Sequence, residues 1–240
     1  MAEPSPYAAG RDVIRRSVAP RAKVMVLDDH RLLAQMLVGH LVERGHEALT
    51  IDATDRRLAE RAIETQPDLL LLDAVFGDDE DAGMQILLRM RVEAPEIDVA
   101  IITGVVERLR HAEFLDAGAC AVITKIDSFD HVTHQIEDLL HGRDPMGARQ
   151  REELRALLDS HRRAEDSEVD ALSSLTSSER STLEGLVAGQ SVQEMAEVRT
   201  VAVSTVRSHV RAVLRKLGVH SQIEAVAVAA NAGVRPRPQR

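Results

Sequence analysis

The chain has 240 residues, enough for one large domain or two of ordinary size; 44% are hydrophobic and 29% are charged. This composition is typical of a globular protein in water, and no apolar run reaches the ~18–20 residues that a bilayer-spanning helix needs. The single cysteine, Cys120, excludes an internal disulfide and a cysteine-based zinc cluster. The N-terminal stretch lacks the apolar segment of a secretory signal, so we expect a cytoplasmic protein without a membrane partner.

Charge is divided unevenly along the chain. The net charge is −9, yet residues from Ala171 onward hold 9 Lys and Arg against 5 Asp and Glu, which leaves −13 for residues 1–170. An acidic body joined to a basic end predicts two domains with different partners, and the basic end is typical of contact with nucleic acid.

In chain order, residues 1–22 show no periodicity and are expected to be a mobile tail. From Lys23 onward, short apolar runs alternate with helical patterns. The runs are VMVL (24–27), LLLL (69–72), VAII (99–102) and AVIT (121–124). The helical patterns end at residues that stop helices: Gly45, Pro67, Pro95, Gly118 and Gly142. The five helical patterns, alternating with these runs, predict five βα units over residues 23–141, and hence a doubly wound α/β domain with a five-stranded parallel sheet.

The pattern changes after Gly142. Segment 142–172 is charged, with one short helical run around Leu154, Leu157 and Leu158, and is predicted to be a partly helical linker. Residues 173–233 show helical patterns only. We expect four short helices there: one after an N-cap at Thr176 or Ser177, then at about 192–198, 203–217 and 221–232. They predict a small all-α bundle, followed by a basic tail at 234–240.

Polar residues stand where the apolar runs of the first domain end. These residues are Asp28, Asp29, Asp73, Thr103 and Lys125. In an open parallel sheet of strand order 2-1-3-4-5, these strand ends are neighbours and form the ligand site. Taken singly, each residue fits an ordinary helix cap, turn or strand end. Together, three carboxylates need a cation, and a hydroxyl with an ammonium suits a phosphoryl group, so the set predicts a metal and phosphoryl site.

These five residues resemble, in type, order and spacing, the site of the receiver domain of two-component response regulators. The resemblance implies a flavodoxin-like receiver over residues 23–141. Asp73 would be the phosphoacceptor that attacks a phosphohistidine on a sensor histidine kinase. Thr103 would hydrogen-bond a phosphoryl oxygen, and Lys125 would pair with the phosphorylated aspartate.

The same resemblance implies Mg²⁺ as the cofactor. Asp29 and Asp73 would bind the ion directly, the backbone carbonyl of Val75 would be a third ligand, and Asp28 would act mostly through water. Mg²⁺ suits such a site because it takes few carboxylates, keeps several waters and neutralises charge on a transferring phosphoryl group.

Two departures from the receiver pattern concern how phosphorylation is transmitted and how the site is bordered. Val122 stands where receivers usually carry a Tyr or Phe that turns inward on phosphorylation. The loop FGDDEDAG (76–83) is about two residues longer than usual and is expected to be a solvated acidic loop. Because Val122 is not aromatic, coupling of Thr103 to the rotamer of an aromatic ring is not expected.

The helix predicted at 203–217 has an apolar face and, beside it, Arg207, Arg211 and Arg215 at intervals of four residues. Its surroundings, with LTSSE, TVRSHV and RKLGV, resemble the LuxR-type helix-turn-helix of NarL/FixJ response regulators. The resemblance implies sequence-specific binding to double-stranded DNA by a homodimer. The residues that would contact DNA are Arg207, Ser208, Arg211, Arg215 and Lys216, the last through phosphate.

Two residues depart from this second pattern. Thr200 replaces the usual turn glycine, and Ala202 replaces the usual Ser or Thr that caps the recognition helix. We expect that helix to begin less firmly, at a cost of about 1 kcal/mol for the missing cap.

The favoured function is a transcription regulator controlled by phosphorylation, and not an enzyme beyond assisting its own phosphorylation and dephosphorylation. Two alternatives stay open. A DNA-binding regulator with a degenerate receiver, controlled by a ligand or protein, would fit Val122. A phosphatase of the haloacid dehalogenase type would need Asp-x-Asp after the first strand, which Asp28-Asp29-His30 does not supply.

Overall fold

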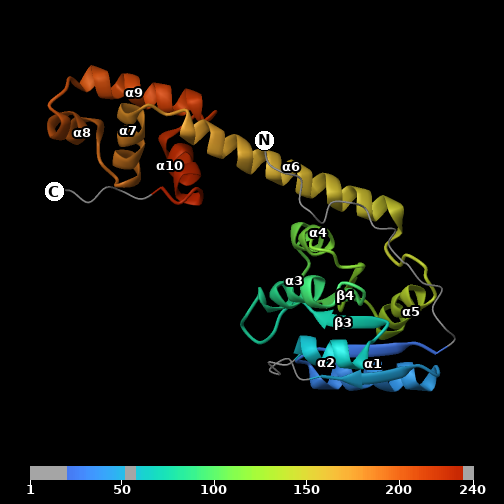
Figure 1. Cartoon of the computed structure of the whole chain (residues 1–240). Coiled ribbons are helices and arrows are strands. Elements are labelled where there is room, and N and C mark those ends of the chain that lie inside the picture. The colour runs from blue at the N-terminus through green and yellow to red at the C-terminus, as the bar shows by residue number, and fades with distance from the viewer. Residues whose placement is uncertain (1–20, 52–57, 235–240) are drawn as a thin grey trace. The chain divides into compact units, whose positions relative to one another are not determined.

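The computed structural model describes residues 21–51 and 58–234, which fall into two compact units, one ending at Leu158 and the other beginning at Asp159. Figure 1 shows the α/β elements of the first unit and the helices of the second. The predicted tails at 1–22 and 234–240 lie almost wholly outside the described residues. Among the helices that are described, none is both long and apolar enough to cross a bilayer.

The first unit is built on a parallel five-stranded sheet. Its strands are β1 (Lys23–Leu27), β2 (Glu47–Thr50), β3 (Leu69–Asp73), β4 (Asp98–Thr103) and β5 (Ala121–Thr124). The order is β2-β1-β3-β4-β5, which confirms the predicted fold. β3 is buried at every position, and its four leucines form a continuous apolar run because helices lie on both sides of the sheet (Figure 1).

Five helices connect and cover the strands. They are α1 (Arg31–Glu43), α2 (Leu58–Thr65), α3 (Ala82–Glu93), α4 (Arg108–Asp116) and α5 (Phe129–Leu140). Gly45 follows α1 with a φ of 93°, a left-handed conformation that glycine adopts without strain. At the start of α3, a Cβ on Gly83 would lie 2.4 Å from the carbonyl oxygen of Ala74, so only glycine permits this close approach to the end of β3.

The linker is more ordered and more helical than its sequence pattern predicts. A single helix, α6, spans Gly147–Ser173, 27 residues. Helix-forming residues and intrahelical ion pairs such as Arg149–Glu153 supply local stability where the apolar pattern is weak. The first part of α6 packs on the first unit, because Leu154 and Leu158 are buried in the core of that unit.

The second unit contains α7 (Ser177–Val187), α8 (Val192–Arg199), α9 (Val203–Lys216) and α10 (Gln222–Asn231). Thr176 is the N-cap of α7, and with Glu179 it forms a reciprocal capping box. The small cores of this unit include Leu183, Met195 and Val206. Because α8, a tight turn and α9 follow one another, the unit has the helix-turn-helix arrangement that the sequence predicts.

The turn between α8 and α9 includes a residue in the left-handed conformation, which glycine usually adopts. Thr200 has φ 53° and ψ 45°, and Ala202, the N-cap of α9, offers no side-chain oxygen. Left-handed backbone costs a non-glycine residue about 1–2 kcal/mol. Both substitutions seen in the sequence therefore fall on positions with specific backbone demands.

We expect Thr200→Gly to stabilise the second unit by up to about 1 kcal/mol, because relief of strain exceeds the extra entropy that glycine gains in the unfolded chain. Hydrogen exchange of α8 and α9 measures this, with slower exchange expected. Ser204→Gly, at an exposed helical position, is the control and should be destabilising. Equal loss of protection in both variants would contradict the strain at Thr200.

Candidate functional site

The sheet brings Asp28, Asp73 and Lys125 together. Leu27 pairs with Leu72, so Asp28 and Asp73 follow side by side at the ends of β1 and β3. The Lys125 ammonium lies 2.9 Å from Asp28 Oδ2 and 2.5 Å from Asp73 Oδ2. The two carboxylates are only 3% and 4% exposed. The Lys125 ammonium therefore offsets part of their negative charge at close range. The predicted convergence of strand ends is therefore present in the structure.

Asp29 stands at the more open side of the site. Its Oδ2 accepts a hydrogen bond from the Gly77 N–H at 2.8 Å, which lowers the pKa of Asp29 below its usual value. Gly77 belongs to the long acidic loop 76–83, so this loop borders the site instead of being wholly solvated. Asp29 is thus held as a carboxylate, the form that binds a cation.

Asp73 is held differently. Burial raises the pKa of its carboxyl to about 6, although the hydrogen bond and charge of Lys125 oppose that shift and nearby Asp28 adds to it. A desolvated carboxylate that is short of positive charge is stabilised by a cation and is a better nucleophile than one in water. The electrostatics therefore favour cation binding at this residue.

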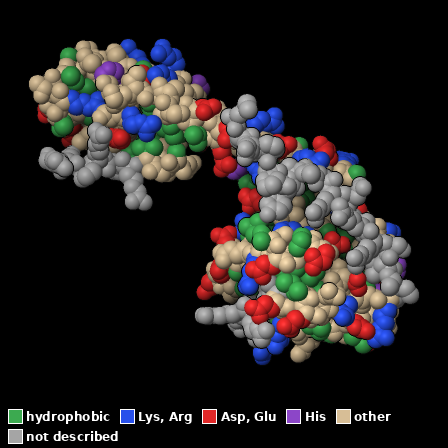
Figure 2. Space-filling view, in the orientation of Figure 1, with side chains coloured by type: hydrophobic (Ala, Val, Ile, Leu, Met, Phe, Trp, Pro, Cys, Tyr) green, Lys and Arg blue, Asp and Glu red, His purple; other side chains and the backbone are tan. Residues whose placement is uncertain are grey.

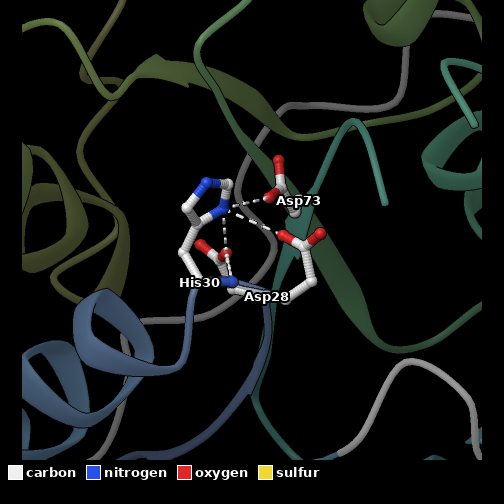
Figure 3. Close-up of side chains that lie close together, drawn as sticks. Asp28, His30 and Asp73 are labelled. Carbon is white, nitrogen blue, oxygen red and sulfur yellow. Dashed lines mark hydrogen bonds and ion pairs between the residues drawn. The ribbon is translucent and has the colours of Figure 1, made fainter. Parts of the chain in front are cut away.

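His30 is a member of the cluster that the sequence reasoning missed. Its Nδ1 lies 2.9 Å from Asp29 Oδ1. The same atom lies 3.3 Å from Asp28 Oδ1 and 3.7 Å from Asp73 Oδ2 (Figure 3). Potential ligand atoms of all four residues fall within 4.8 Å of one another. The signal was the run Asp28-Asp29-His30, which places an imidazole directly after the acids, at the N-cap of α1.

The donor set fits Mg²⁺. Three carboxylates supply hard oxygen ligands, and one ammonium leaves their charge uncompensated. Val75, whose carbonyl is a predicted ligand, lies two residues beyond Asp73, and its N–H is 3.4 Å from Asp73 Oδ1. Ligation by that carbonyl stays a prediction.

We expect His30→Ala to tighten Mg²⁺ binding by roughly 2- to 10-fold, because the cation no longer competes with hydrogen bonds from His30 Nδ1 worth about 0.5–1.5 kcal/mol. Isothermal titration with Mg²⁺ measures the affinity. His134→Ala, on exposed α5 surface, is the control and should leave it unchanged. Weaker binding in His30→Ala would instead make the imidazole a ligand.

Thr103 ends β4 and is fully buried. Its Oγ1 accepts a hydrogen bond from the Val105 N–H at 2.9 Å. Because Asp73 pairs with Ile102, Thr103 stands one residue further along the neighbouring strand. The hydroxyl is thus at the edge of the site, and its proton remains available for an oxygen acceptor.

The candidate DNA-binding face lies on α9. Arg207, Ser208, Arg211 and Arg215 are exposed, whereas Val206, Val210 and Val213 are buried against the bundle. Figure 2 shows Lys and Arg side chains along the outer edge of this unit, where α9 runs in Figure 1. One face of the helix therefore holds the bundle together while the other presents cations.

Lys216 is placed differently from the sequence prediction. Its Nζ donates to Glu179 Oε2 at 2.7 Å and to the Ser174 carbonyl at 2.8 Å. Hydrogen bonds from Lys216 and from the Thr176 N–H lower the pKa of Glu179 to about 2. The ammonium is therefore engaged with the capping box of α7, which argues against a phosphate contact. The resemblance implies a phosphate contact for Lys216, but a step of 100° along the helix from Arg215 turns Lys216 toward α7.

Two family models match the chain, one over each unit. Residues 24–137 match the response regulator receiver domain, and residues 173–229 match the luxR family of bacterial regulatory proteins. A glycerol metabolism activator of Pseudomonas putida is 27% identical over 210 residues, covering 85% of this chain and 93% of that protein. The response regulator VraR of Staphylococcus aureus is 27% identical over 205 residues, covering 85% and 94%.

A solved structure of the response regulator RcsB of Salmonella typhimurium has a TM-score of 0.50 at 16% identity, covering 89% of this chain and all of that one. This likeness concerns the fold. Taken with the matched domains, it places the chain in a class of two-domain proteins with a receiver fold and a helix-turn-helix unit. The chain belongs to the response regulators that combine a receiver with a LuxR-type DNA-binding domain.

Proposed function

We propose that this response regulator accepts a phosphoryl group on Asp73 from a sensor histidine kinase and controls transcription through its helix-turn-helix unit. The single observation that carries the proposal is the buried pair Asp28 and Asp73 with Lys125 between them, beside Asp29. In this site, Mg²⁺ would be held by Asp29, Asp73 and the Val75 carbonyl, and would neutralise charge on the transferring group.

The arrangement supports the following transfer step. An Asp73 carboxylate oxygen attacks phosphorus and forms the O–P bond, while the P–N bond to the kinase histidine breaks and its electrons return to the imidazole. Lys125, now bound to Asp73 Oδ2, then pairs with the phosphorylated side chain. The Thr103 hydroxyl donates a hydrogen bond to a phosphoryl oxygen. Asp28, held by Lys125, would contribute to Mg²⁺ binding mostly through water.

The kinase partner would approach the open end of the site. Beside Lys125 lies a hollow of about 200 Å³ lined by Leu33, Met36 and Phe129 among others. Met36 and Ile126 expose 45% and 66% of their surfaces nearby. Exposed apolar side chains around a polar reaction centre suit a transient protein partner. Action in the cytoplasm stays a prediction from the sequence.

DNA would be bound by α9 in the major groove, with Arg207 and Arg211 reaching base edges or phosphates. We propose that two copies bind inverted half-sites as a homodimer, so that operator symmetry mirrors protein symmetry. Phosphorylation would favour this state by changing contacts between the receiver and the linker.

Acetyl phosphate with Mg²⁺ tests the phosphoryl chemistry. We expect one acid-stable, base-labile phosphoryl adduct per chain, seen by intact mass, and none in Asp73→Ala. Asp78→Ala, in the acidic loop, is the matched control and should be phosphorylated normally. The degenerate-receiver alternative, which Val122 favours, predicts no adduct under any condition and unchanged binding of DNA.

A further inference from the structure

The start of α6 is docked on the first unit by several independent contacts. The Arg108 guanidinium at the beginning of α4 pairs with Glu153 at 2.9 Å. Arg151 donates to the Cys120 carbonyl at 2.6 Å, next to β5. Leu154 is 1% exposed, so apolar burial supplies most of the docking, while the exposed ion pair fixes its register.

The backbone of Val122, which replaces the usual aromatic switch residue, is also in contact with this segment. Its N–H faces the sulfur of Met146 at 3.3 Å, and Met146 is 7% exposed just before α6. The chain's own linker therefore packs against β5 at the position where receivers usually signal. Valine has no aromatic ring that could change its position on phosphorylation. A conformational change at the site must therefore reach the linker through other residues.

A continuous set of contacts leads from the phosphoryl site to α4. Thr103 Oγ1 accepts the Val105 N–H at 2.9 Å, and the Val105 carbonyl accepts a hydrogen bond from His111 Nε2 at 2.7 Å. His111 is buried in α4, one turn after Arg108. A Thr103 hydroxyl that moves toward a phosphoryl oxygen shifts Val105, and the buried imidazole ties that shift to the helix.

Resting on the proposed phosphorylation of Asp73, we infer that the contacts Thr103–Val105–His111 and Arg108–Glu153 transmit it through α4 to the first half of α6, in place of an aromatic switch. His111 and Arg108 are positioning residues in this account. The loop 76–83 is tied to the same helix, since Arg110 pairs with Asp81 at 2.5 Å. Helix α4 thus links both sides of the site to the linker.

Hydrogen exchange of the full chain, with and without Mg²⁺ and beryllofluoride as a phosphoryl mimic, tests the inference. We expect beryllofluoride to slow exchange in residues 73–77 and to speed exchange in residues 147–158 by about three- to tenfold. In His111→Leu, the change at 73–77 should persist and the change at 147–158 should be lost. His111→Gln, which keeps a donor for the Val105 carbonyl, should restore it.

A charge swap tests the second contact without altering the buried residues. Arg108→Glu should speed exchange of 147–158 before activation by up to about fivefold. Because Glu153 also pairs with Arg149 within α6, the reversing variant combines Arg108→Glu with Glu153→Arg and Arg149→Glu, which restores both ion pairs with opposite sign. Arg89→Glu on α3 is the matched control. A response at 73–77 with none at 147–158, or an unchanged response in His111→Leu, overturns the inference alone. No response at 73–77 in the wild type overturns the phosphorylation proposal with it.

Discussion

Asp73→Asn should raise the free energy of unfolding of the Mg²⁺-free receiver at pH 7 by up to about 3 kcal/mol. The reason is that burial raises the pKa of Asp73 to about 6, so keeping this carboxylate ionised costs the folded state free energy. Asparagine removes the charge with little change in shape, and Lys125 keeps its ion pair with Asp28. The ionised side chain of Asp73 is therefore expected to destabilise the folded receiver.

The pH dependence has a defined sign. Between about pH 4 and 6 the folded protein holds a proton on Asp73 that the unfolded chain has lost, so the contribution of Asp73 to stability falls as pH rises through that window. The difference between wild type and Asp73→Asn should grow over the same window and then level off. Urea denaturation in EDTA, monitored by hydrogen exchange in β1 and β3, measures the free energy of unfolding of the receiver separately.

Asp78→Asn removes the same charge from the exposed loop and is the control. It should leave both the stability and its pH dependence close to those of the wild type. An Asp73→Asn variant that is less stable than wild type at pH 7 would contradict the raised pKa, because it would mean that the ionised carboxylate stabilises the fold.

Arg207→Ala together with Arg211→Ala should weaken specific DNA binding by about thirtyfold or more. Both side chains are exposed on α9, and each arginine contact to a base edge is worth about 1–3 kcal/mol. Fluorescence anisotropy with operator DNA measures the affinity, and its salt dependence should flatten by about one for each lost phosphate contact.

Two variants serve as controls for this prediction. Arg163→Ala, exposed on α6, removes a cation outside α9 and should bind DNA normally. Lys216→Met should lower the stability of the second unit, because Glu179 loses its ion pair, without changing the salt dependence of binding. Normal binding by the arginine double variant would place the DNA contacts elsewhere.

Much of the fold and of the candidate site at the strand ends follows from the sequence because parallel topology dictates where strand ends meet. Once the runs ending at Leu27, Leu72 and Thr124 are assigned as strands, Asp28, Asp73 and Lys125 have to converge. The exposed stripe on α9 follows in the same way from helical periodicity, since Val206 and Val210 bury one face.

The features that the sequence did not predict depend on tertiary contacts, which the spacing of apolar residues does not reveal. His30, the N-cap of α1, contacts Asp29, and Lys216 contacts Glu179, 37 residues earlier. The length of α6 was underestimated because its helix is stabilised by local ion pairs and by docking of Leu154, not by a repeated apolar stripe.

The most direct test of the central claim is the affinity of the full chain for inverted-repeat operator DNA, measured with Mg²⁺ in the presence and absence of acetyl phosphate. We predict that acetyl phosphate tightens binding by tenfold or so in the wild type, about 1.4 kcal/mol, and leaves Asp73→Ala unchanged. Identical affinities of the wild type under both conditions, with the adduct on Asp73 verified by mass, would contradict control of DNA binding by phosphorylation.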